Sequence, residues 1–114
     1  MSDTILQETI KLLSSDLEID HQYFPVVEEE TEAWVQLRRL VAEKILYLME
    51  NDVEQLKYIL YRLDVNERKV KKVLSESPFG EAADGIAELI LKREMEKAQT
   101  RQQYGSGKSN WLDV

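Results

Sequence analysis

Helix-breaking residues are nearly absent from the first two-thirds of this 114-residue chain, and this restricts its fold more than any other feature. All four glycines lie at or beyond Gly80, and the two prolines are Pro25 and Pro78. Between these interruptions, apolar residues recur every three or four positions, which is the spacing of one face of an α-helix. No segment alternates apolar and polar residues with the β-branched enrichment of a strand. We therefore expect an all-α protein.

The apolar spacing predicts up to five helices. They are expected at residues 2–17, 26–50 and 53–63, in a short segment after Asn66, and at about 81–104. Within residues 34–49, apolar side chains cover well over half of the helix circumference, so this helix should be contacted from more than one side. We expect a compact bundle of four to five helices built around it, formed by a single domain of residues 1–104.

The composition limits the classes of function. The net charge is −7, and it divides into −8 for residues 1–61 and +1 for residues 62–114. A negatively charged protein is repelled by nucleic acids and anionic lipids, so we expect no membrane partner and rank nucleic acid low. The absence of cysteine excludes disulfides and thiolate chemistry and suits a reducing compartment. Because no signal sequence or membrane span is visible, we expect a cytoplasmic location.

No arrangement of residues predicts catalysis, a cofactor or a metal site. The only histidine, His21, lies in an expected loop without a nucleophile or metal ligands at a useful spacing. The glutamates within residues 28–32 offer oxygen atoms suited to magnesium or calcium, but carboxylates also favour the positive end of a helix dipole. Residues 105–109 lack the first glycine, the strand and the helix of a phosphate-binding loop. An enzyme pocket lined by scattered carboxylates and tyrosines stays an alternative.

The most specific local pattern covers residues 63–74. A turn residue, a valine and a capping asparagine lead into a helix that is apolar at Val70 and Leu74. This pattern resembles the turn and second helix of bacterial helix-turn-helix proteins, with Asp64 where glycine is common. The resemblance, over about twenty residues, implies a DNA-contacting helix whose phosphate contacts would be Arg68, Lys69, Lys71 and Lys72. A short junction that brings valines and Leu74 to a core produces the same pattern.

Two features near the C-terminus indicate contact with another protein. The second half of the last helix is nearly all polar, so it should project from the body or pack on a partner chain, including a second copy. Its bases, which would face the acidic residues 28–32 within one chain or across a dimer, are Lys92, Arg93, Lys97 and Arg101. Residues 105–114 form an expected flexible tail, in which the candidate docking residues are Trp111, Leu112 and Val114. The tail has two other outcomes, folding back on the helices or staying disordered.

The expected function is therefore non-catalytic interaction with an unknown protein partner, by an adaptor-like helical domain. A homodimer is one form that this interaction can take. The alternative is a helix-turn-helix regulator that contacts DNA with residues 63–74. The sequence identifies neither the partner nor the pathway.

Overall fold

A computed structural model describes the backbone of residues 2–24 and 30–113, and the side chains of residues 5–24, 31–78 and 80–102. This part of the chain contains helices and no strand, which confirms the expected all-α fold. The elements are α1 (Ser2–Leu17), the short 3₁₀-helix η1 (His21–Tyr23), α2 (Glu30–Asn51), α3 (Val53–Leu63), α4 (Glu67–Glu76) and α5 (Phe79–Asp113). None of the described helices is long and apolar enough to cross a membrane.

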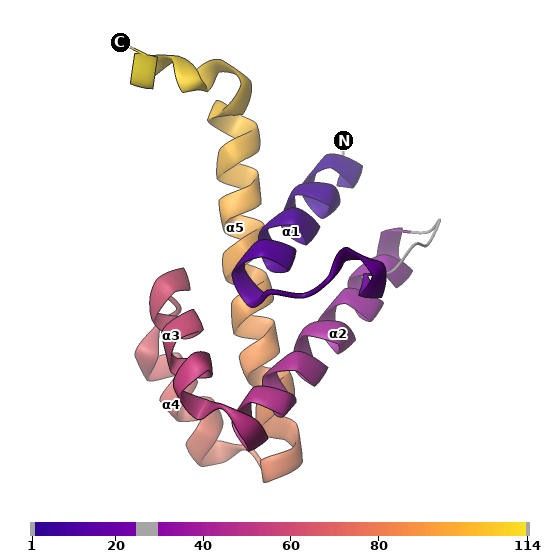
Figure 1. Cartoon of the computed structure of the whole chain (residues 1–114), viewed down its shortest axis with the longest axis vertical. Helices are drawn as coiled ribbons and strands as arrows, with labels where there is room; N and C mark the ends of the chain where they lie inside the picture. The colour runs from indigo at the N-terminus through magenta and orange to yellow at the C-terminus, as the bar shows by residue number, and fades with distance from the viewer. Residues whose placement is uncertain (1, 25–29, 114) are drawn as a thin grey trace.

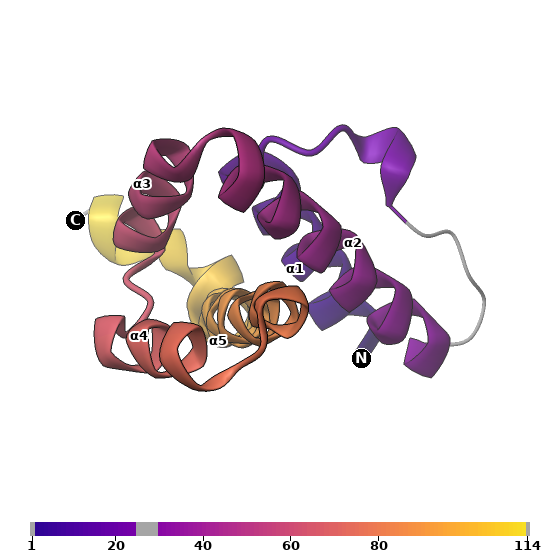
Figure 2. The ribbon, with the colours of Figure 1, turned by 90° about the horizontal axis from the view of Figure 1, so that it is seen from below.

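Helix α5 forms the axis of the bundle. It runs between α1 and α2 on one side and α3 and α4 on the other (Figures 1 and 2), and all four helices pack against it. The apolar pattern of the sequence had instead predicted a bundle built around residues 34–49, which lie in α2. Helix α5 takes this position because several of its buried residues are alanines, at positions 82, 83, 87 and 98, and small side chains let neighbouring helices approach closely. Alanines contribute little to an apolar pattern, so the sequence signal of α2 was stronger.

Large aliphatic side chains from four helices meet in one core. The most completely buried are Leu13 and Leu17 of α1, Leu37, Val41 and Ile45 of α2, Leu63 of α3, and Ile86 and Ile90 of α5. Within each helix they follow the three- and four-residue spacing of one helix face. Burying one such side chain stabilises the fold by about 1.5–3 kcal/mol. The core therefore fixes how α1, α2, α3 and α5 lie relative to one another.

Helices α1 and α3 end in the same way. Glu18 and Asp64 adopt the left-handed conformation, with φ of 56° and 61°. In each case the next backbone N–H reaches back to a carbonyl five residues earlier, from Ile19 to Ser14 and from Val65 to Leu60, both at 3.1 Å. This arrangement is a Schellman motif, which satisfies the last carbonyls of a helix and reverses the chain. Here both left-handed positions hold an acidic residue rather than glycine.

The second half of α5 packs against α1 and does not project from the body up to Arg101. Glu94 and Ala98 have no exposed surface, although they lie in the stretch that the sequence analysis expected to protrude. That expectation is wrong for residues 92–101, because Glu94 and Ala98 are buried and Arg93, Lys97 and Arg101 contact residues of α1 and α3. The backbone stays helical to Asp113 and bends near its end (Figure 1, yellow). The side chains of residues 103–114 lie outside the described part, so the flexible tail stays a prediction.

Candidate functional site

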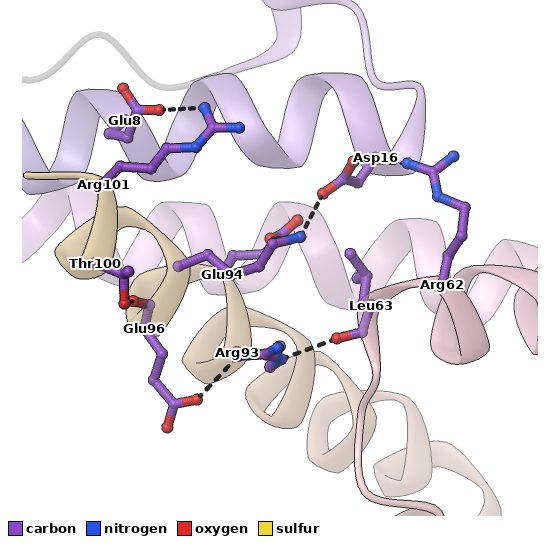
Figure 3. Close-up of polar contacts among 10 residues, drawn as sticks. Glu8, Asp16, Arg62, Leu63, Arg93, Glu94, Glu96, Thr100 and Arg101 are labelled. Carbon is purple, nitrogen blue, oxygen red and sulfur yellow. Dashed lines mark hydrogen bonds and ion pairs between the residues drawn. The ribbon is translucent and has the colours of Figure 1, made fainter. Parts of the chain in front are cut away.

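Four ionisable side chains from α1, α3 and α5 meet where these helices pack together, and we call them the ionic cluster (Figure 3). Asp16 of α1 accepts a hydrogen bond from Arg62 of α3 at 2.8 Å, and its other oxygen lies 3.6 Å from Nζ of Lys97 on α5. The same Nζ lies 3.5 Å from Oε1 of Glu94. The Glu94 side chain has no exposed surface, and that of Asp16 is 11% exposed. The ionic cluster therefore ties α1 to both α3 and α5.

Glu94 holds a proton at neutral pH. Among the described residues, neither of its carboxyl oxygens has a hydrogen-bond donor, and the buried Oδ2 of Asp16 has none either. Burial and the neighbouring Asp16 carboxylate, which accepts a hydrogen bond from the protonated acid, raise the pKa of Glu94 to about 8, against the opposing effect of Lys97. The proton therefore supplies the missing donor and removes one buried negative charge.

The bases that the sequence analysis assigned to a partner are largely engaged within the chain. Arg93 donates to the last carbonyl of α3 at 2.9 Å, and Arg101 forms an ion pair of 2.7 Å with Glu8 of α1. Lys97 belongs to the ionic cluster, whereas Lys92 is exposed. Within the chain, Arg93, Lys97 and Arg101 contact α1 or α3, and the contact of these bases with residues 28–32 stays a prediction.

Helix α4 presents its predicted DNA-contacting side chains to solvent. Arg68, Lys69, Lys71 and Lys72 are all exposed. The helix packs on α5 through Val70, which is buried, and Val73, which is partly buried. Leu74 is 50% exposed, so the expectation that it reaches the core is wrong; α4 turns only a narrow apolar edge inward. Asp64 supplies the left-handed conformation that glycine usually provides in such turns.

Other predicted features either lie apart from these contacts or outside the described residues. The side chains of the tail residues Trp111, Leu112 and Val114 lie outside, as do Glu28 and Glu29. His21 is exposed in η1, with its ring 6.1 Å from that of Phe24. Within the described part, no group of three or more histidine or acidic side chains is placed to hold a metal ion. The expected absence of catalysis stays a prediction.

Tyrosine side chains are left on the surface. Every tyrosine whose side chain the structure describes is more than half exposed: Tyr23 by 64%, Tyr47 by 58%, Tyr58 by 53% and Tyr61 by 85%. Tyr58 lies beside the guanidinium of Arg62, which is 5.8 Å from the ring centre. In the sequence, tyrosines entered only as the lining of an alternative enzyme pocket. The spacing of Tyr58 and Tyr61 predicts that they are exposed, because on α3 they lie opposite the apolar stripe of Leu56, Ile59 and Leu63.

The segment after α1 runs alongside α2 (Figures 1 and 2), and side chains of these elements line two hollows. The first, of about 280 Å³, lies between this segment and the middle of α2, and the second, of about 400 Å³, lies near the junction of α2 with α3. Glu18 and Lys44 line both hollows, which therefore adjoin, and we call the two together the groove. Its other lining residues include Asp20, Tyr23, Leu40, Glu43, Tyr47, Asp52 and Gln55.

No model of a protein family, no curated protein and no solved structure matches this chain. Its function is therefore argued from the tyrosines, the groove and the basic face of α4.

Proposed function

We propose that this chain is a non-catalytic protein-interaction domain that binds its partner through its exposed tyrosines. The observation that carries the proposal is the exposure of every described tyrosine, at 53–85%. A tyrosine ring contributes large apolar area with little loss of side-chain freedom, and its hydroxyl group forms hydrogen bonds, so tyrosines are enriched where proteins bind one another. Two of these tyrosines also border the groove.

The contacts of the charged residues favour the tyrosine surface, rather than the bases of α5, as the site that binds a partner. Arg93, Lys97 and Arg101 contact carboxylates or a backbone carbonyl of their own chain, so binding a partner through them would require breaking these contacts. The tyrosine rings are more than half exposed, so a partner can cover them without breaking an ion pair. We therefore place the interaction on α2, α3 and the segment after α1.

Site-specific photocrosslinking in the source cells tests this proposal. A benzophenone amino acid replaces Tyr47 or Tyr61 in the full chain, and a matched control carries it at Glu81, an exposed position at the start of α5. We expect adducts of defined mass from the two tyrosine positions and none from the control. An adduct with a second copy of the chain would identify the partner as a homodimer.

The control defines the outcome that contradicts the proposal. Adducts that form equally from Glu81 would show random collision, and no adduct from either tyrosine position would show that this surface is not bound. Circular dichroism spectra that match the parent chain exclude unfolding as the cause of either result.

A second candidate function, DNA binding by α4, is favoured by one observation. All four bases of α4 are exposed, and the preceding turn of residues 64–66 contains the left-handed Asp64. Glu67 and Glu76 on the same helix reduce its charge, and Glu67 pairs with Lys71 at 3.4 Å. The attraction of the four bases of α4 to DNA phosphates must also overcome the repulsion from the net charge of −7 on the whole chain.

Salt dependence separates DNA binding from protein binding. Affinity for a duplex should fall steeply between about 50 mM and about 200 mM salt, and Lys69→Glu/Lys72→Glu should abolish it. The control Lys11→Glu/Lys92→Glu makes the same change of net charge on exposed lysines of α1 and α5. If no duplex binding is detected at low salt, or if both double substitutions weaken it equally, α4 is not a DNA-binding helix.

We also propose that the domain acts in the cytoplasm. The chain has no cysteine, so it gains nothing from an oxidising compartment. Imaging of a fluorescent fusion in the source cells tests the location, and export of the fusion from the cell would contradict it.

A further inference from the structure

The groove carries negative charge that the chain does not neutralise. Its lining includes four carboxylates, those of Glu18, Asp20, Glu43 and Asp52, but one base, Lys44. Asp20 and Asp52 accept backbone hydrogen bonds as helix caps. None of the four carboxylates forms an ion pair with a residue that the structure describes. Asp16 of the ionic cluster, by contrast, lies against the bases Arg62 and Lys97, so the groove differs from the ionic cluster in the negative charge that it leaves unpaired.

The groove also provides aromatic surface beside this charge. Tyr23 borders the first hollow and Tyr47 the second, and the partly buried Leu40 contributes apolar surface between them and the core. Ammonium and guanidinium groups are attracted to the face of a tyrosine ring as well as to carboxylates. The chain itself shows this contact, because Nζ of Lys44 lies 5.9 Å from the centre of the Tyr47 ring.

We propose that the groove binds a lysine- or arginine-bearing segment of a partner protein. This inference rests on the proposed function and adds the chemistry of the partner to it. The carboxylates attract the charged ends of the segment, and the rings of Tyr23 and Tyr47 cover the apolar stems of its side chains. Lys44 lines both hollows, so it repels such a segment where they adjoin. Removal of its charge should therefore strengthen binding.

Fluorescence anisotropy with a labelled hexa-arginine peptide as the probe tests the groove in the full chain. Glu18→Gln/Glu43→Gln removes two exposed charges from the groove and should weaken binding about tenfold. The matched control, Glu76→Gln/Glu81→Gln, removes two exposed charges from α4 and α5 and should weaken it less than about threefold.

A substitution that removes the positive charge from the groove tests the same proposal in the opposite direction. Lys44→Gln should tighten peptide binding by about threefold, because a like charge leaves the groove. The control Lys11→Gln removes an exposed base from α1 and should have a smaller effect. Both substitutions are at helical positions that tolerate glutamine, and circular dichroism checks that all variants keep the fold.

Three results would overturn the proposal. Equal weakening by the two acidic pairs would show attraction to the overall negative charge instead of the groove. The absence of peptide binding at low salt would show that the groove holds no basic segment. Self-association of the parent chain that Glu18→Gln/Glu43→Gln abolishes would assign the groove to a second copy.

Failure of this inference can be told apart from failure of the proposed function. Tyr61 does not line the groove. If photoadducts at Tyr61 persist while the peptide results contradict the groove, the interaction function stands and uses another part of the surface. If no tyrosine position gives an adduct, the proposed function fails, whatever the peptide shows.

Discussion

At the scale of single residues, the carboxyl group of Glu94 couples the stability of the fold to pH. Its pKa is about 8 in the folded chain against an ordinary value of 4.5. Between these values the folded chain holds a proton on Glu94 that the unfolded chain has lost. The stability that this group contributes is therefore complete below the ordinary pKa and is lost as the pH rises towards and through about 8, by at most about 1.4 kcal/mol per pH unit.

Glu94→Gln should remove this pH dependence, because the amide keeps the shape of the side chain and donates a hydrogen bond to Asp16 without titrating. We expect the variant to gain stability relative to the parent as the pH rises from about 5 to about 8, as measured by urea unfolding followed by circular dichroism. The control is Glu96→Gln, at an exposed position of the same helix. Parallel stability curves for Glu94→Gln and the parent would contradict the protonated state of Glu94.

Replacement of Asp64 by glycine should stabilise the fold. The left-handed conformation at φ 61° is strained for a residue with a Cβ atom, and a carboxylate at the C-terminus of α3 also meets the negative end of the helix dipole. We expect Asp64→Gly to raise the free energy of unfolding by about 1 kcal/mol, as a shift of the urea midpoint at unchanged slope. Asp64→Ala removes the charge and keeps the strain, so it should gain clearly less. A loss of stability in Asp64→Gly would show that the carboxylate makes a stabilising contact.

At the scale of elements, sequence patterns located most helix ends. The predicted segments 2–17 and 53–63 match α1 and α3 to within about one residue, and Asn66 caps α4 as expected, because its side chain accepts hydrogen bonds of 2.9 Å and 3.2 Å from the amide groups of Arg68 and Lys69. Such signals are local, because a cap acts on N–H groups two or three residues away. The packing of α5 escaped prediction, because its alanines and Glu94 become inner-face residues only when α1 lies opposite.

The contact between α4 and α5 depends on a glycine. A Cβ atom at Gly85 would lie 2.8 Å from Cγ1 of Val73, which is closer than carbon atoms approach without strain. We expect Gly85→Ala to destabilise the fold by about 1–3 kcal/mol, since the branched valine cannot swing away freely. This cost outweighs the gain of about 1 kcal/mol that alanine brings inside a helix.

A double-mutant cycle checks the cause of this effect. In a Val73→Ala background the methyl groups that would clash are absent, so Gly85→Ala should there be neutral or stabilising in urea unfolding. If Gly85→Ala costs the same in both backgrounds, its effect does not come from the contact with Val73.

At the scale of the whole molecule, the core formed by the described residues ends at Ala98, before the tail of residues 105–114 begins. The last fully buried described residue is Ala98, and Arg101 holds α5 to Glu8 of α1. Removal of residues 105–114 should therefore leave the urea midpoint unchanged, whereas a chain that ends before Ala98 should unfold at clearly lower urea. If Trp111 anchors the partner as the sequence indicates, the shorter chain should also lose its photoadducts. A lower midpoint after removal of residues 105–114 alone would show that the tail packs on the helices.

The sequence by itself determined the helices, most of their ends and the inner residues of α1 and α2, because helical spacing and capping act within a few neighbouring residues. It could not determine that α5 is the axis, that Glu94 is buried beside Asp16, or that the segment after α1 meets α2 at a groove. These depend on which helices lie side by side, and so on contacts between residues up to ninety-three positions apart, as for Glu8 and Arg101. Tertiary packing alone brought Arg93, Lys97 and Arg101 of α5 into contact with α1 and α3, and it left every described tyrosine more than half exposed.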